Sequence, residues 1–216
     1  LTNPPKVAEV LRSAGVGWVT ITNNHRHDGS VEATVKGLAE HGVTTVADSR
    51  VDASRWSFLA RDLDAGEPDL SPIAGIAAAG RLPVVSLHVT GPPSFLPRPE
   101  LVAGIEAAIA AGARAIVGVG THALARVERR AGPRGDVIIA MGLGNLRFAC
   151  ACTDGRDGLV LELTERGGAL EACVVAIRAG LEAEPTRLAA NPNETFDLLA
   201  SLRSSPLRRD GARAWF

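Results

Sequence analysis

The sequence has few cysteines, almost no net charge and no long apolar run. Three cysteines among 216 residues cannot build a framework of several disulfides. A formal net charge of −1 gives no basic field that would attract nucleic acid or an anionic membrane. No apolar run is long enough to span a bilayer, and no signal peptide is visible in these residues. We therefore expect no nucleic-acid partner, and these residues predict no localisation.

What is present is the composition of a folded protein. Hydrophobic residues make up 46% of the chain and charged residues 22%, which excludes an intrinsically disordered class. A chain of this length can bury a sizeable core as one domain.

Segments with helical spacing alternate with short apolar segments along most of the chain. The helical spacing covers residues 7–14 (with Asn3 as cap and Pro4 as first helical residue), 31–39, 71–76 and 99–111. The strand-like segments are residues 16–21, 43–47, 83–87, 115–117 and 137–140. This alternation predicts an α/β fold with a largely parallel sheet.

The C-terminal third has a different pattern. Residues 159–164 and 169–175 flank a Gly-Gly turn, which predicts a hairpin and hence antiparallel strands. A last helix is expected at 194–202. We expect residues 1–203 to form a single domain and the basic residues 204–216 to form a loose tail. Residues 50–70 show no readable pattern.

Polar side chains gather where the predicted parallel strands end. TNNHRHDGS, residues 22–30, follows the first strand and contains His25 and His27, while His88 and His122 follow two later strands. Ligands bind at this edge of open α/β sheets. Imidazole and carboxylate groups bind divalent metals, and a nearby histidine can donate a proton. One such histidine alone is more often a solvated or capping residue, but the joint pattern favours a shared site.

Other polar residues have simpler explanations. His41 suits a helix C-terminus, and Asn23 can serve either the site or a local turn. Gly142-Leu143-Gly144-Asn145 can cradle a phosphate, but a tight turn is favoured. Cys150 and Cys152 can hold a metal or form a redox pair, but two small, partly buried residues are favoured.

Four sequence motifs occur in the same order as in a known protein family. NPPKVAEVLRSAGVGWVTITNNHRHDG combines a helix, an Ala-Gly turn, a strand and the pattern Asn-Asn-His-x-x-Asp. VVSLHVTGP, AGARAIVGVGTHALARVE and GLGNLRF come later. Together they resemble the bacterial CapA-type poly-γ-glutamate capsule synthesis proteins, in which the corresponding motifs are Ser-x-His, Gly-His-His-Pro-His and Ser-Leu-Gly-Asn-Phe. The resemblance runs from about residue 3 to about residue 148.

The resemblance implies a metallophosphatase-like fold, with two sheets sandwiched between helices, and divalent metal ions as cofactors. It implies Asn24, His88 and His122 as metal ligands and His25 as the catalytic imidazole. Asp28 matches the motif's aspartate and is grouped with the catalytic residues.

The sequence also departs from the family's pattern. Gly-His-His-Pro-His is replaced by Gly118-Val119-Gly120-Thr121-His122, so a histidine is missing at Gly120. The family's Gly-Asp and second acidic motifs would precede Leu1. We therefore expect the family's first strands to lie outside these residues, and metal binding to be weak.

Two functions remain open at this point. The first is a metal-dependent hydrolase of capsule or poly-γ-glutamate metabolism, acting on an anionic polymer or a small molecule. The second is a non-catalytic accessory that binds a polyanion and has a degenerate metal site. Relatives are often membrane-anchored or located in the cell envelope, and neither localisation nor oligomeric state is predicted from this chain.

Overall fold

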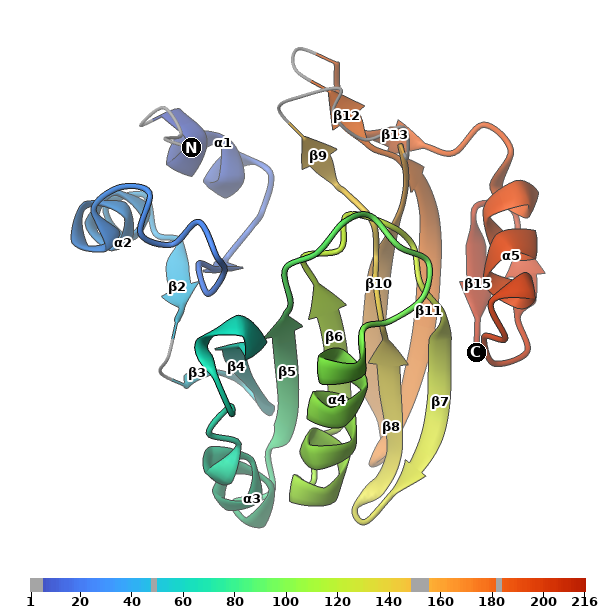
Figure 1. Cartoon of the computed structure of the whole chain (residues 1–216), viewed down its shortest axis with the longest axis horizontal. Coiled ribbons are helices and arrows are strands. Elements are labelled where there is room, and N and C mark those ends of the chain that lie inside the picture. The colour runs from blue at the N-terminus through green and yellow to red at the C-terminus, as the bar shows by residue number, and fades with distance from the viewer. Residues whose placement is uncertain (1–5, 48–49, 149–155, 182–183) are drawn as a thin grey trace.

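The structure is a computed structural model that describes residues 6–47, 50–148, 156–181 and 184–216 (Figure 1). The expectations for Asn3, Pro4, Cys150 and Cys152 lie outside these residues. The described elements form a mixed α/β protein.

A six-stranded sheet forms the centre of the molecule, with strand order β3-β4-β5-β6-β8-β7. Its strands are β3 (Val51–Ala53), β4 (Trp56–Asp62), β5 (Leu82–His88), β6 (Ala115–Val119), β7 (Val127–Gly132) and β8 (Gly135–Ala140). The four inner strands run parallel, and β3 and β7 run antiparallel at the two edges. The predicted α/β class with a largely parallel sheet is therefore confirmed.

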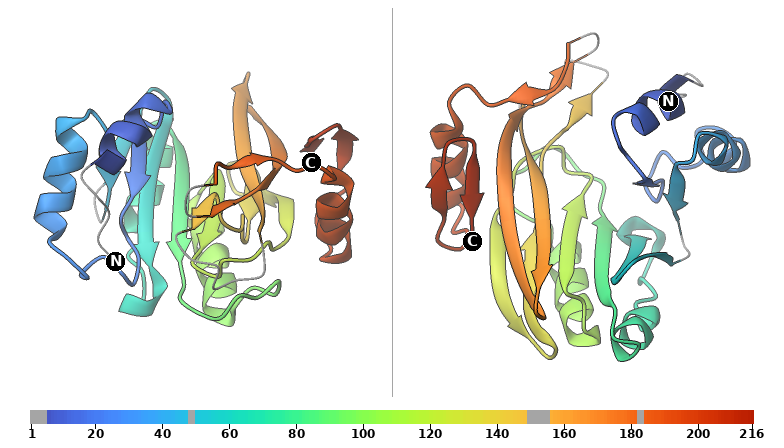
Figure 2. Two further views of the ribbon diagram at one scale, coloured as in Figure 1. Left: turned by 90° about the horizontal axis from the view of Figure 1, so that it is seen from above. Right: turned by 180° about the vertical axis from the view of Figure 1, so that it is seen from behind.

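Two helices, α3 (Ser71–Ala78) and α4 (Pro99–Ala111), cover one face of this sheet (Figure 2). Successive side chains of a strand point to opposite faces. In β8, Val137 and Ile139 accordingly pack with the helices, while Ile138 faces the other side. Pro99 begins α4, and Gly112 ends it at φ 100°, a left-handed conformation that glycine adopts without strain.

An antiparallel sheet stacks on the other face of the six-stranded sheet (Figure 2). Its strands are β10 (Asp157–Arg166), β11 (Ala169–Arg178), β13 (Arg187–Leu188), β14 (Arg208–Asp210) and β15 (Arg213–Trp215). A short parallel pair, β9 (Arg147–Phe148) with β12 (Gly180–Leu181), lies beside it. The predicted hairpin is confirmed as β10 and β11, with both turn glycines at positive φ. The last helix is α5 (Pro192–Ser201), whose Phe196 and Leu199 are buried in a cluster that also contains residues of both sheets.

The C-terminal segment is part of this sheet, so the expectation of a loose tail is wrong. Strands β14 and β15 form a hairpin, and β15 pairs with β11. Ala214 is fully buried, and the arginines are held by partners: Arg208 lies 4.7 Å over the Trp215 ring, and Arg209 donates to Asp197 at 2.7 Å. The sequence alone does not reveal this order, because the strand and the carboxylate that hold these residues belong to other elements.

The first described elements form a small separate unit. Strands β1 (Trp18–Thr20) and β2 (Thr44–Val46) pair in parallel, and α1 (Lys6–Ser13) and α2 (Val31–Glu40) accompany them. A small core of Ala8, Leu38 and Val43 holds this unit together. Trp18 stacks on Phe58 of β4, with ring centroids 5.9 Å apart. None of the described helices is long and apolar enough to cross a membrane.

Arg129 of β7 ties the two sheets and the C-terminal strand together. Its guanidinium donates to the carbonyl oxygens of Phe216 at 2.9 Å and of Leu170 at 2.8 Å, and to Asp136 at 3.0 Å. Hydrogen bonds from charged groups contribute about 1.5–3 kcal/mol each, and carbonyls left unpaired are costly. We expect Arg129→Met to lower the free energy of unfolding by about 2–4 kcal/mol, measured by urea denaturation.

The neighbouring arginine provides the control for this variant. Arg130 pairs through both terminal nitrogens with Glu106 at 2.8 Å, but this pair lies at the surface. Surface pairs contribute about 0–1 kcal/mol, so Arg130→Met should cost much less than Arg129→Met. Equal losses for the two variants would contradict the role given to Arg129.

Candidate metal centre

The carboxyl ends of the adjacent parallel strands β4, β5 and β6 lie at one edge of the sheet, where several polar side chains meet. Asp62 at the end of β4 is the register partner of His88 at the end of β5, and His88 is the partner of Val119 on β6. The short helix η1 (Leu63–Ala65) begins directly after β4, and Asp62 caps it by accepting a hydrogen bond from the Asp64 backbone at 3.1 Å. This turn places Asp64 beside His88.

Asp62, Asp64 and His88 form a compact group of potential metal ligands. One ligand atom from each lies within 4.8 Å of those of the other two. His88 is buried, and its Nδ1 lies 3.2 Å from Asp62 Oδ1. Asp64 Oδ2 accepts a hydrogen bond from the backbone N–H of Thr90 at 2.7 Å. The three side chains are thus held by the strand ends and by the loop that follows β5.

The surroundings of Asp64 keep its carboxyl group ionised. Burial opposes ionisation of Asp64, but the hydrogen bonds from Thr90 and the charges of His88 and Arg98 outweigh it and hold the pKa of Asp64 below its ordinary value. Two carboxylates and one imidazole are ligands typical of divalent metal ions. The donor set therefore fits such an ion.

Gly120 lies directly against His88 and has no room for a side chain. A Cβ atom at this position would lie 2.3 Å from the Val89 carbonyl oxygen and 2.9 Å from His88 Nε2. Its φ of 106° also disfavours any residue with a side chain. The histidine that the family's motif would place here cannot fit this backbone.

His122 lies outside the group formed by Asp62, Asp64 and His88. Its Nδ1 lies 2.9 Å from Oδ1 of Asn145, which is buried in the segment that follows β8. His122 has φ 55°, a conformation that a residue other than glycine rarely adopts. Leu143 and Gly144 form isolated β-bridges with Leu124 and Gly158, so the favoured prediction of a tight turn at residues 142–145 is wrong. This segment brings the Asn145 amide to His122.

The loop of residues 22–28 holds the other expected residues. His25 and Asp28 are exposed and pair with each other, with His25 Nδ1 2.8 Å from Asp28 Oδ2. Asn23 accepts a hydrogen bond from the His25 backbone at 2.9 Å, the local turn that the sequence had left open. His25 does not belong to the group of potential metal ligands found among the described residues.

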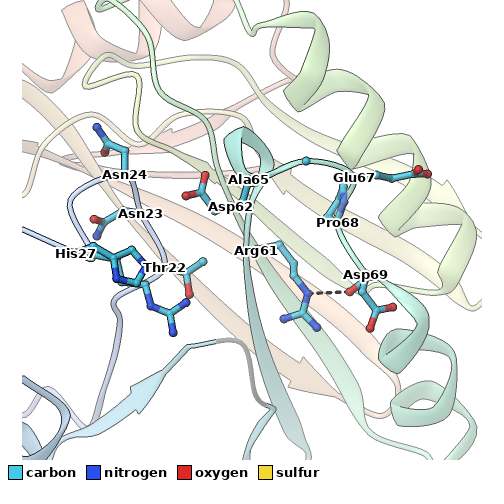
Figure 3. Close-up of a pocket in the computed structure, with 12 residues that line it drawn as sticks. Thr22, Asn23, Asn24, His27, Arg61, Asp62, Ala65, Glu67, Pro68 and Asp69 are labelled. Atoms are coloured by element: carbon cyan, nitrogen blue, oxygen red, sulfur yellow. Dashed lines mark hydrogen bonds between the residues drawn. The ribbon is translucent and has the colours of Figure 1, made fainter. Parts of the chain in front are cut away.

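A cleft connects this loop to the metal-ligand group. Its volume is about 460 Å³, and Asn24 and Asp62 both line it. Figure 3 shows Asn23, Asn24 and His27 on one side of the cleft, and Arg61 and Asp62 from β4 on the other. Arg61 donates to the Asp69 carbonyl oxygen at 2.7 Å. Of the expected ligands, the structure therefore brings Asn24 to the cleft beside Asp62, and His88 into the metal-ligand group.

Sequence reasoning missed Asp62 and Asp64 because they lie in the segment that showed no readable pattern. Trp56–Ala60 is nevertheless an apolar run followed by two carboxylates, the same arrangement that singled out the histidines. From the sequence, Asn145 is expected in a tight turn or a phosphate cradle, whereas its contact with His122 depends on the pairing of β6 with β8.

Comparison of the sequence with protein-family profiles and with curated proteins finds no match. The resemblance described above therefore stays a prediction based on motifs.

Proposed function

We propose that this chain is a metal-dependent hydrolase, similar to the CapA-type proteins of capsule and poly-γ-glutamate metabolism, that acts on an anionic polymer or a small anionic molecule. The observation that carries the proposal is the group of Asp62, Asp64 and His88 at the carboxyl edge of a parallel sheet. The finer fold assignment, a metallophosphatase-like sandwich, belongs to this proposal. Helices on one face of the main sheet and a second sheet on the other support it.

The proposed roles of Asp62, Asp64, His88 and Asn24 follow from their positions, and that of His25 follows from the resemblance. Asp62, Asp64 and His88 would hold a divalent ion, which supplies Lewis-acid polarisation of the scissile group when bound. Asn24 lines the cleft next to Asp62 and would orient the substrate with its amide. His25, whose ring is oriented by Asp28, would protonate the leaving group. The cleft is lined by Arg26 and Arg61 but also by Asp62, Glu67 and Asp69, so the bound ion would supply the positive charge that an anionic substrate needs.

The experiment measures metal content and hydrolysis on the same preparation. The purified chain is loaded with Mn²⁺, Zn²⁺ or Mg²⁺, its metal content is determined by mass spectrometry, and release from a generic phosphodiester and from poly-γ-glutamate is followed. About one tightly held ion per chain, with turnover that a chelator abolishes, supports the hydrolase. A chain that binds no ion under these conditions would rule it out.

His25→Ala distinguishes the hydrolase from the non-catalytic accessory. Because His25 is exposed and outside the metal-ligand group, we expect the metal affinity to stay within about twofold and the stability within about 0.5 kcal/mol. Turnover should fall by about 10²-fold or more, the usual contribution of a general acid. Metal binding without measurable turnover in the unmodified chain would favour the accessory with a polyanion ligand.

A further inference from the structure

We propose that Arg98 is a positioning residue of the metal centre: it holds Thr90 in place, and the Thr90 backbone N–H in turn orients the carboxylate of Asp64 toward the ion. This inference rests on the function proposed above and deepens it, because it concerns the same metal-ligand group. Arg98 lies outside the four sequence motifs of the resemblance.

Arg98 closes the loop that joins β5 to α4. This loop, residues 89–98, leaves the carboxyl edge of the sheet at the end of β5 and leads into the helix (Figure 1). Arg98 is the N-cap residue of α4, and its backbone carbonyl accepts a hydrogen bond from Val102 at 3.1 Å. Its Nη1 donates to the carbonyl oxygen of Thr90, eight residues earlier in the chain. The side chain of Arg98 therefore ties the two ends of the loop together.

The surroundings of the Arg98 side chain fix its position. A Cβ atom at Gly91 would lie 2.8 Å from Arg98 Nη1 and 3.2 Å from Cδ, so the arginine lies directly against the backbone of Gly91. Arg98 Nε donates to Glu100 Oε2 at 3.4 Å. The side chain is thus held by a carbonyl group, by a glycine backbone and by a carboxylate.

Thr90 connects Arg98 to the metal-ligand group. Its backbone N–H donates to Asp64 Oδ2 at 2.7 Å, and hydrogen bonds to an ionised acceptor are stronger than neutral ones. With Oδ2 held, the carboxylate cannot rotate freely, and Oδ1 is left for an ion shared with Asp62 and His88. Partners that orient a metal ligand in this way commonly contribute about 10–100-fold to metal affinity.

The charge of Arg98 and its positioning role predict effects of opposite sign. Arg98 is close enough to Asp64 for its charge to contribute to the lowered pKa of that carboxyl group. If only this charge mattered, Arg98 would repel a divalent ion, and its removal would tighten metal binding. If Arg98 positions Asp64 through Thr90, its removal weakens metal binding. The direction of the change in Kd therefore separates the two roles.

The first test measures the Kd for Mn²⁺ by isothermal titration. We expect Arg98→Met to raise the Kd by about tenfold or more. Arg98→Lys keeps the charge and a donor for the Thr90 carbonyl, so its Kd should stay within about threefold of the unmodified chain. Arg130→Met is the control, because Arg130 pairs with Glu106 and not with this loop. A Kd for Arg98→Met that falls or stays unchanged would overturn the proposal.

Gly91→Ala displaces the Arg98 side chain without removing its charge. Gly91 is not among the glycines with positive φ, so alanine fits the backbone, and the added methyl group pushes Nη1 away. We expect the Kd for Mn²⁺ to rise by about threefold to tenfold. Combined with Arg98→Met, it should add nothing, because both changes remove the same contact. Additive losses would contradict this shared contact.

The last test observes Thr90 without any metal. The full chain is labelled with ¹⁵N, and hydrogen exchange of the Thr90 amide is compared with that of Ile105, which is buried in α4. We expect Arg98→Met to speed exchange at Thr90 by about tenfold and to leave Ile105 unchanged. Unchanged exchange at Thr90 would overturn the proposal.

The two proposals fail in different ways. If the unmodified chain binds no ion, the proposed function and the metal role of Arg98 both fail. If the unmodified chain binds an ion, but Arg98→Met changes neither the Kd nor the exchange at Thr90, only the role of Arg98 fails.

Discussion

Asp64→Asn is expected to weaken divalent metal binding by about 100-fold or more. Loss of a residue that merely supports a ligand costs about 10–100-fold in metal affinity, and loss of a direct carboxylate ligand should cost at least that much. The asparagine oxygen can still accept the hydrogen bond from the Thr90 backbone, so the loop should keep its conformation. Isothermal titration with Mn²⁺ and Zn²⁺ measures the change, and circular dichroism checks the fold.

Asp69→Asn is the matched control for that variant. Asp69 lines the same cleft, and its pKa is lowered mainly by its hydrogen bond to Ser71, but it does not belong to the metal-ligand group. Asparagine can still accept the 3.0 Å bond from the Ser71 backbone. We expect the metal affinity to change by less than about threefold, as for a charge outside the coordination sphere. Similar losses for both variants would mean that the acidic field of the cleft, and not ligation by Asp64, attracts the ion.

Gly120→Ala is expected to have the largest effect on stability. The added methyl group meets the Val89 carbonyl oxygen at 2.3 Å and the His88 ring at 2.9 Å, on a backbone with φ 106°. Backbone strain costs about 1–3 kcal/mol and overpacking about 1–3 kcal/mol, so the free energy of unfolding should fall by about 2–6 kcal/mol. Metal affinity should fall as well, because His88 must move. Gly120→His should be worse than alanine, although the family's motif has histidine there.

Gly66→Ala separates the cost of backbone strain from the cost of overpacking. Gly66 has a comparable φ of 114°, but a Cβ atom there meets nothing within 4 Å. This variant should lose only the strain of about 1–3 kcal/mol. Urea denaturation of both proteins measures the difference, and a loss at Gly66 as large as that at Gly120 would contradict the steric argument.

The main elements could be predicted from the sequence because their signals are local. Helix α4 begins at a proline and ends at a glycine, and the β10–β11 turn consists of two glycines, so neighbouring residues suffice to locate them. Strand β8 was recognised from its apolar run, and its buried residues face both layers. The C-terminal hairpin was missed because its stability comes from distant partners, such as Asp197 for Arg209 and β11 for β15.

The candidate site was predicted only in part, for a related reason. The position of His88 could be predicted, because the sequence pattern shows that it ends a parallel strand, and ligands bind at the carboxyl edge of such a sheet. Asp62 and Asp64 depend on β4, whose residues gave no clear alternation, and on the capped turn of η1. The contact of Asn145 with His122 depends on two strand ends coming together in space. The lack of space at Gly120 is caused by atoms of Val89 and His88, so it could not be predicted from the spacing of residues in the sequence.

The unit formed by α1, β1, α2 and β2 has a consequence for how the cleft behaves. Within the described residues, no backbone hydrogen bond joins this unit to the six-stranded sheet, and the Trp18–Phe58 stack is a contact between side chains. The two walls of the cleft, which carry Asn24 and Asp62, therefore belong to two units that meet through side-chain contacts. A substrate that touches both walls would hold the two units together, so we expect it to slow hydrogen exchange at the amides of β1 and β2.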